Sequence, residues 1–147
     1  MLRPGFMRSS RKGNNIIEFA ILAPWYLFLS VGAFDMGIYN YALIGVQNAA
    51  RTVAQYCSIS STTCSSGNTA CLYAVDQLRD LPNVGSGVTT CTNPSPVAVS
   101  VTYVTGPDGN TAAQVTVSYT SPNLIPLPNS IPAQYTASRT VTMRTQS

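Results

Sequence analysis

Glu18 is the residue of this sequence under the strongest chemical constraint. It lies in the apolar segment Ile16–Phe34, whose 19 residues contain no other charge. An ionised side chain in an apolar helix of membrane length costs between about 2.5 and more than 10 kcal/mol, depending on the scale. A nearby ammonium group offsets that cost only where the two charges meet. The sequence therefore predicts a positively charged partner for Glu18.

The cysteines are the second set of residues with possible chemistry. Cys57, Cys64, Cys71 and Cys91 all follow the apolar segment, and the first three are separated by six residues each. Zinc sites favour two to four residues between paired cysteines, and the chain has no His to complete such a site. An even number of cysteines in a small exported domain favours two disulfides. Three pairings are possible and the sequence selects none of them, with free thiols or a metal site as the alternatives.

Catalytic chemistry is not indicated. Asp76 and Asp80 share a helical spacing that could serve a metal or an acid–base pair, but Arg79 lies between them and the pattern favours a solvated helix face. The chain has no His, its single Lys is Lys12, and no nucleophile elbow, phosphate loop or zinc motif occurs. We therefore expect no enzyme activity, no catalytic residue, no bound metal and no cofactor.

The charges are segregated along the chain. The formal net charge is +3, yet four of the eight basic residues belong to residues 1–13. From Asn14 onward the chain contains four arginines and five acidic residues, so that part has a net charge of −1. Nucleic-acid binding is therefore not indicated. The positive-inside rule predicts that residues 1–13 form a cytoplasmic leader and that the part after the apolar segment is translocated to the other side of the membrane.

A single long helix is predicted from about Asn14 to Tyr56. Residues 14–35 are long enough to cross a bilayer, and Pro24 is expected to kink this part or to open one backbone hydrogen bond. Residues 36–57 continue the helix outside the membrane with a narrow stripe of mostly small residues. We expect that stripe to pack against other helices. The stripe consists of Ile38, Tyr41, Ala42, Gly45, Val46, Ala49, Ala50, Val53 and Ala54.

Residues 58–147 are predicted to form a small α+β head held by disulfides. A short helix is expected over about Ala70–Leu81, with Thr69 as its N-cap and Pro82 and Asn83 at its end. Its expected buried side consists of Leu72, Val75, Leu78 and Leu81.

Three antiparallel strands are expected in the second half of the head. Apolar and polar residues alternate over residues 97–103, 114–119 and 135–143, and the turn residues 106–110 join the first two runs into a hairpin. Arg139 falls on the inward face of the last strand. Four prolines over residues 122–132 exclude a central strand there. Three apolar residues of that loop are expected to tuck against the sheet: Leu124, Ile125 and Leu127.

The beginning of the chain resembles the TadE-like family, pseudopilins of the tight-adherence (type IVb, Flp-type) pilus of bacteria. The resemblance covers roughly residues 11–56. It is carried by Gly13, the pair Glu18-Phe19, Pro24, Gly32-Ala33-Phe34-Asp35 and Ala49-Ala50-Arg51.

The resemblance implies a specific processing and assembly route. A prepilin peptidase would cut between Gly13 and Asn14, so that Glu18 becomes the fifth residue of the mature chain. Glu18 would then pair with the amino terminus of a neighbouring subunit and fix the register of assembly. The implied product is a minor, non-enzymatic component of a Tad-type pilus. Its implied location is the bacterial inner membrane, crossed once, with a periplasmic or extracellular C-terminal domain. The implied partners are other pilins, the Tad assembly machinery and the peptidase.

Several alternatives remain open from the residues themselves. The chain could be an uncut anchor, or a signal peptidase could cut after Val31-Gly32-Ala33. Asp35 could mark the outer membrane edge or pack against a partner, and Arg51 could be solvated or paired with a carboxylate. The alternative function is a membrane-anchored binding or adhesion module that never enters a filament.

Overall fold

The computed structural model describes residues 14–60, 62–64, 67–85, 87–92, 95–122 and 134–146. The chain divides into two compact units, Met1–Gly37 and Ile38–Ser147. The leader, including Gly13, lies outside the described residues. The same holds for Leu124, Ile125 and Leu127, for which a contact with the sheet was predicted.

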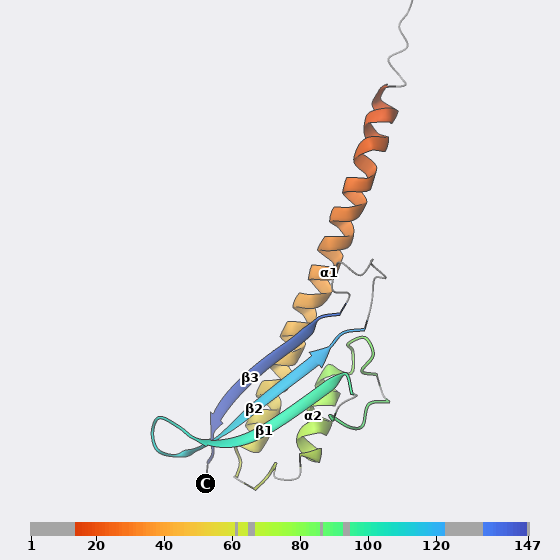
Figure 1. Cartoon of the computed structure of the whole chain (residues 1–147). Helices are drawn as coiled ribbons and strands as arrows, with labels where there is room; N and C mark the ends of the chain where they lie inside the picture. The colour runs from red at the N-terminus through yellow and green to blue at the C-terminus, as the bar shows by residue number, and fades with distance from the viewer. Residues whose placement is uncertain are drawn as a thin grey trace, which may run out of the picture. The chain divides into compact units, whose positions relative to one another are not determined.

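Helix α1, Asn14–Cys57, is one continuous helix of 44 residues, as predicted (Figure 1). At about 1.5 Å per residue it is roughly 66 Å long. Pro24 lies inside the helix and does not end it. One helix among the described residues is long and apolar enough to cross a membrane, and it is α1.

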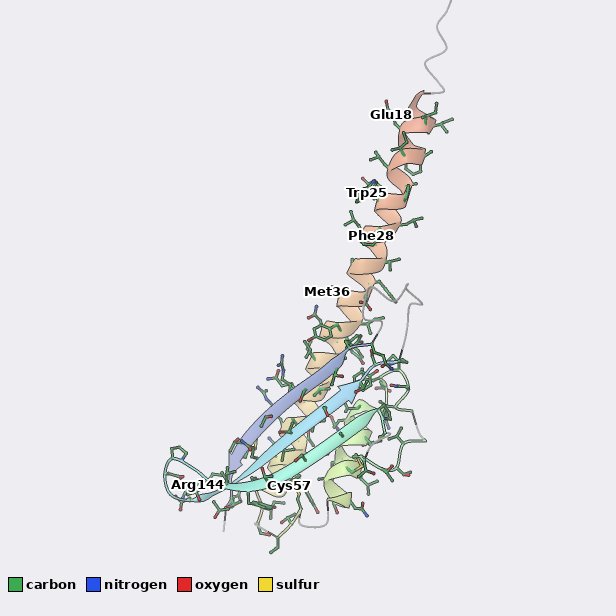
Figure 2. The ribbon with its side chains drawn as sticks, viewed as in Figure 1. Glu18, Trp25, Phe28, Met36, Cys57 and Arg144 are labelled. Atoms are coloured by element: carbon green, nitrogen blue, oxygen red, sulfur yellow. A yellow bond between two sulfur atoms is a disulfide. The ribbon has the colours of Figure 1, made fainter. Side chains whose placement is uncertain are left out.

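The first unit contains the apolar part of α1. From Ile16 to Gly37 every side chain is exposed except the half-buried Ala23. Figure 2 shows Trp25, Phe28 and Met36 along this segment. Exposed apolar side chains along six turns have no favourable contact with water. This part of α1 is therefore suited to a lipid environment or to contact with other apolar helices.

The second unit places the other half of α1 against the head, which corrects one prediction. Ala42, Val46, Ala49, Ala50 and Val53 are fully buried within this chain. The stripe was expected to pack against other helices, but the sheet and α2 of the same chain cover most of it, and Tyr41 alone of its members is exposed. Its small side chains let the chain's own sheet lie close to the helix, and that intramolecular contact is available as soon as the head folds.

Helix α2, Asn68–Leu78, begins two residues earlier and ends three residues earlier than predicted. Its N-cap is Gly67, with a φ of 67°, so Thr69 lies inside the helix and is not the cap. Leu72 was predicted to be buried but is 58% exposed. The buried side is centred on Ala70, Ala74 and Leu78, because alanines allow α2 to approach the rest of the core more closely than leucines would.

The sheet consists of β1 (Val97–Thr105), β2 (Thr111–Thr120) and β3 (Thr136–Arg144) in the order β1-β2-β3. Both pairs are antiparallel, as predicted. In Figure 1 the second half of α1 and α2 lie on one side of this sheet. The inward side chains of the central strand, including Val115, Val117 and Tyr119, are fully buried, whereas the opposite face presents mostly Ser and Thr.

The β1–β2 connection is the predicted turn. The Gly106 N–H donates to the Asn110 carbonyl at 2.7 Å, and the Asp108 carboxylate accepts from the Asn110 backbone N–H and side-chain amide. These hydrogen bonds from Asn110 lower the pKa of Asp108. Arg144 at the end of β3 lies 3.4 Å from the same carboxylate, so the turn is also tied to the last strand.

Candidate functional site: helix α1 and its attachment to the head

The residues with an implied role in assembly lie in the exposed part of α1. Asn14 is the first residue of the helix, and Glu18 and Phe19 follow one turn later. Glu18 is exposed and Phe19 is 69% exposed. Figure 2 labels Glu18 near the start of the helix. A carboxylate and a large apolar side chain thus lie on adjacent positions of an exposed stretch of α1.

Asp35 lies at the other end of the apolar segment and is exposed. It is the first charged residue after Glu18, and polar residues become frequent after it. Both the predicted position at the membrane edge and the predicted packing contact are compatible with this exposure.

The segment Ala49-Ala50-Arg51 divides between two sides of α1. Ala49 and Ala50 are fully buried, while Arg51 is exposed and forms no ion pair with any described residue. The two alanines thus serve the contact between α1 and the sheet. The side chain of Arg51 remains available on the solvent side of the helix.

The four cysteines form two disulfides. Cys57 is bonded to Cys64 and Cys71 is bonded to Cys91. The first bond closes the loop that leaves α1, and the second ties α2 to the segment that leads into β1. The prediction of two disulfides is confirmed, and the tertiary structure selects one pairing from the three that the sequence allowed.

Tyrosine hydroxyls make attachments that the sequence did not reveal. The Tyr103 hydroxyl of β1 donates to the carbonyls of Cys57 and Ser60, at 3.3 and 3.2 Å. The Tyr119 hydroxyl of β2 donates to the Pro82 carbonyl at 2.9 Å. Alternation predicted that both rings face inward, but their partners are 46 and 37 residues away and carry no sequence signal. These bonds join the sheet to the loops that follow α1 and α2.

Burial raises the pKa of Tyr119 to about 12, from an ordinary value of 10.0. Loss of the proton would leave a phenolate in an apolar core beside a carbonyl oxygen, which is unfavourable. The hydroxyl of Tyr119 is therefore a structural donor at neutral pH.

Asp76 and Asp80 are both exposed, as predicted for a solvated face. Asp76 lies 3.8 Å from Arg79, and the two side chains are each 67% exposed. Over the described residues no group of three His, Cys, Asp or Glu side chains is placed to hold a metal ion.

Comparison with known families bears on α1. The family model described as TadE-like protein matches residues 16–55. The TadE-like resemblance is thereby confirmed for this segment. No curated protein and no solved structure matches the chain. The TadE-like segment contains both the exposed apolar part of α1 and the part buried against the head. The family match indicates a component associated with the Tad pilus. The apolar N-terminal helix is consistent with a membrane anchor.

Proposed function

We propose that the chain is a minor pseudopilin of a Tad-type pilus and acts without catalysis. The observation that carries the proposal is that the TadE-like segment contains the apolar stretch Ile16–Phe34, whose single acid is Glu18, and that this stretch is exposed except at the half-buried Ala23. A helix of this kind is stable in a bilayer, and it is also suited to exchange lipid for neighbouring pilin helices. The disulfide-bonded head is then delivered to the periplasm or to the filament surface.

In the proposed route a prepilin peptidase cuts between Gly13 and Asn14. Cleavage creates an ammonium group at Asn14, five residues from Glu18 when both are counted. That ammonium of one subunit pairs with the Glu18 carboxylate of another and offsets the cost of placing both charges among apolar helices. A subunit displaced by one helical turn would leave both charges unpaired, so the pair fixes the register.

The mature amino terminus tests the processing step. Mass spectrometry of protein purified from cells with the Tad system should find a chain that begins at Asn14. A chain that retains Met1, or one that begins at Phe34, would favour the membrane-anchored adhesion module over the pseudopilin.

Substitution of Glu18 tests the assembly step separately. The Glu18→Gln variant keeps the size of the side chain but loses its charge, and we expect piliation to fall at least about tenfold at an unchanged level of membrane-inserted protein. Glu18→Asp is the matched control, because it retains a carboxylate and should retain part of the piliation. Equal piliation by the wild-type chain and Glu18→Gln would refute the register role.

A further inference from the structure

The exposed side of α1 within the head carries an apolar patch that the chain leaves uncovered. Tyr41 is 58% exposed and Ile44 is 62% exposed, although Ala42, Val46, Ala49 and Val53 on the opposite side of the same helix are fully buried. Asn48 and Arg51 continue the exposed side, and both are exposed. We call Tyr41, Ile44, Asn48 and Arg51 the outer stripe of α1.

The members of the outer stripe lie on one face of α1 and span about one and a half heptads. The intervals between its members are three, four and three residues, and they correspond to alternating a and d positions of a heptad. Asn48 occupies an a position. A single Asn at such a position favours a dimer of parallel helices in one register, because the amides pair only with each other.

A cavity beside the outer stripe adds a charged group to this surface. It has a volume of about 160 Å³ and lies between α1 and the C-terminal end of α2. Its lining consists of Tyr41, Ile44, Gly45 and Asn48 on α1, Gln77 on α2, and Asp80 and Leu81 just after α2. Asp80 is exposed and forms no ion pair with a described residue, and the same holds for Arg51. One surface thus presents an unpaired carboxylate and an unpaired guanidinium.

The Arg51 guanidinium and the Asp80 carboxylate are placed to pair between two copies of the chain. Side chains of a helix lean towards its N-terminus, so the guanidinium of Arg51 lies near the level of Asn48, which lines the cavity together with Asp80. In a parallel dimer with a two-fold axis along the helices, Arg51 of each chain would face Asp80 of the other. Two chains anchored by the same N-terminal segment enter a membrane with the same polarity, so the parallel arrangement is open to them.

We propose that the outer stripe of α1, together with the cavity next to Asp80, is the docking surface for a second copy of this chain. The dimer buries Tyr41 and Ile44 against their counterparts, pairs the two Asn48 amides and forms two Arg51–Asp80 ion pairs between chains. It goes beyond the proposed function, because it requires a shared membrane but no filament.

Charge reversal in the full-length chain, purified in detergent micelles, tests the proposal by sedimentation equilibrium. We expect the wild type to be dimeric, and Arg51→Asp and Asp80→Arg each to weaken dimerisation about tenfold. The double variant Arg51→Asp/Asp80→Arg should return to within about threefold of the wild type. Arg139→Asp is the matched control, since Arg139 is exposed on β3 and should leave the dimer unchanged.

Cysteine cross-linking in native membranes provides the second measurement. The four native cysteines are occupied in disulfides, so Ile44→Cys adds one free thiol per chain and should give a covalent dimer on mild oxidation. Ser138→Cys, exposed on the opposite side of the sheet, should remain monomeric. The proposal would be overturned by a monomeric wild type, by a double reversal that restores nothing, or by an Ile44→Cys product that contains a different protein. Loss of piliation with intact dimers would instead concern the pilus function alone.

Discussion

At the scale of single residues, the hydroxyl of Tyr119 links the sheet to the turn after α2. The ring is fully buried and the hydroxyl donates to the Pro82 carbonyl. Buried hydrogen bonds of this kind contribute about 1 kcal/mol, and an unpaired buried carbonyl costs about 1–3 kcal/mol.

The raised pKa of Tyr119 predicts a loss of stability at alkaline pH. The unfolded chain loses this proton near pH 10, whereas the folded chain holds it until about pH 12. The stabilising contribution is therefore fully present below pH 10 and declines as the pH rises from 10 to 12. Titration followed by tyrosinate absorbance should show a late phase near pH 12.

The variant Tyr119→Phe tests whether the late phase belongs to Tyr119. This variant should lose the late phase of the titration and should be less stable at pH 7 by about 1–2 kcal/mol, because the Pro82 carbonyl loses its donor. If the late phase persists in Tyr119→Phe, another tyrosine is responsible and the buried hydrogen bond has been misassigned.

At the scale of elements, α1 meets α2 and the residues just after it at Gly45. A Cβ at this position would lie 3.5 Å from Leu78 Cδ2 and 3.9 Å from Leu81 Cδ1. That is ordinary van der Waals contact, so a methyl group at this position would fit without moving either leucine.

The effects of Gly45→Ala and Gly45→Ile on the stability of the head should therefore differ in sign. Alanine should leave stability unchanged or raise it by up to about 1 kcal/mol, because it favours the helix. Isoleucine should lower it by about 1–3 kcal/mol, since its branches overlap Leu78 and displace α2. Chemical unfolding followed by circular dichroism measures both, and an isoleucine variant as stable as alanine would contradict this packing.

The local properties of the elements were predictable from the sequence, whereas the contacts between elements were not. The length of α1, the β1–β2 hairpin and the outward Ser and Thr residues follow from periodicity and turn residues, which are local properties. The prediction for the buried side of α2 is confirmed at Val75, Leu78 and Leu81 and wrong at Leu72. Ala70 and Ala74 complete the buried side in the folded chain, and leucine spacing alone does not reveal them.

At the scale of the whole molecule, the head is a small core that depends on covalent links. The two disulfides join residues separated by 7 and 20 positions. In the chain-entropy account, the stabilisation by a disulfide grows with the logarithm of the closed loop.

Removal of the two disulfides should thus have graded effects. We expect Cys57→Ser/Cys64→Ser to cost about 2.5 kcal/mol and Cys71→Ser/Cys91→Ser about 3.3 kcal/mol in the unfolding free energy of the head. Thermal unfolding of the full chain in detergent, with and without reductant, compares them. The reverse order, with the shorter loop more important, would indicate that native packing rather than loop closure governs the difference.

The sequence by itself determined the long apolar helix with its single acid, the α+β class, the hairpin of the first two strands and the existence of two disulfides. Each of these follows from composition, periodicity or turn residues within a short stretch of chain. Only the tertiary structure decided which cysteines pair, which carbonyls Tyr103 and Tyr119 bind, and which side of α1 the head covers. Those outcomes depend on residues many positions apart meeting in one core, and short-range patterns do not contain that information. The small-residue stripe shows the difference: its pattern predicted a close contact, and the fold made that contact within the chain, leaving Tyr41 and Ile44 outside.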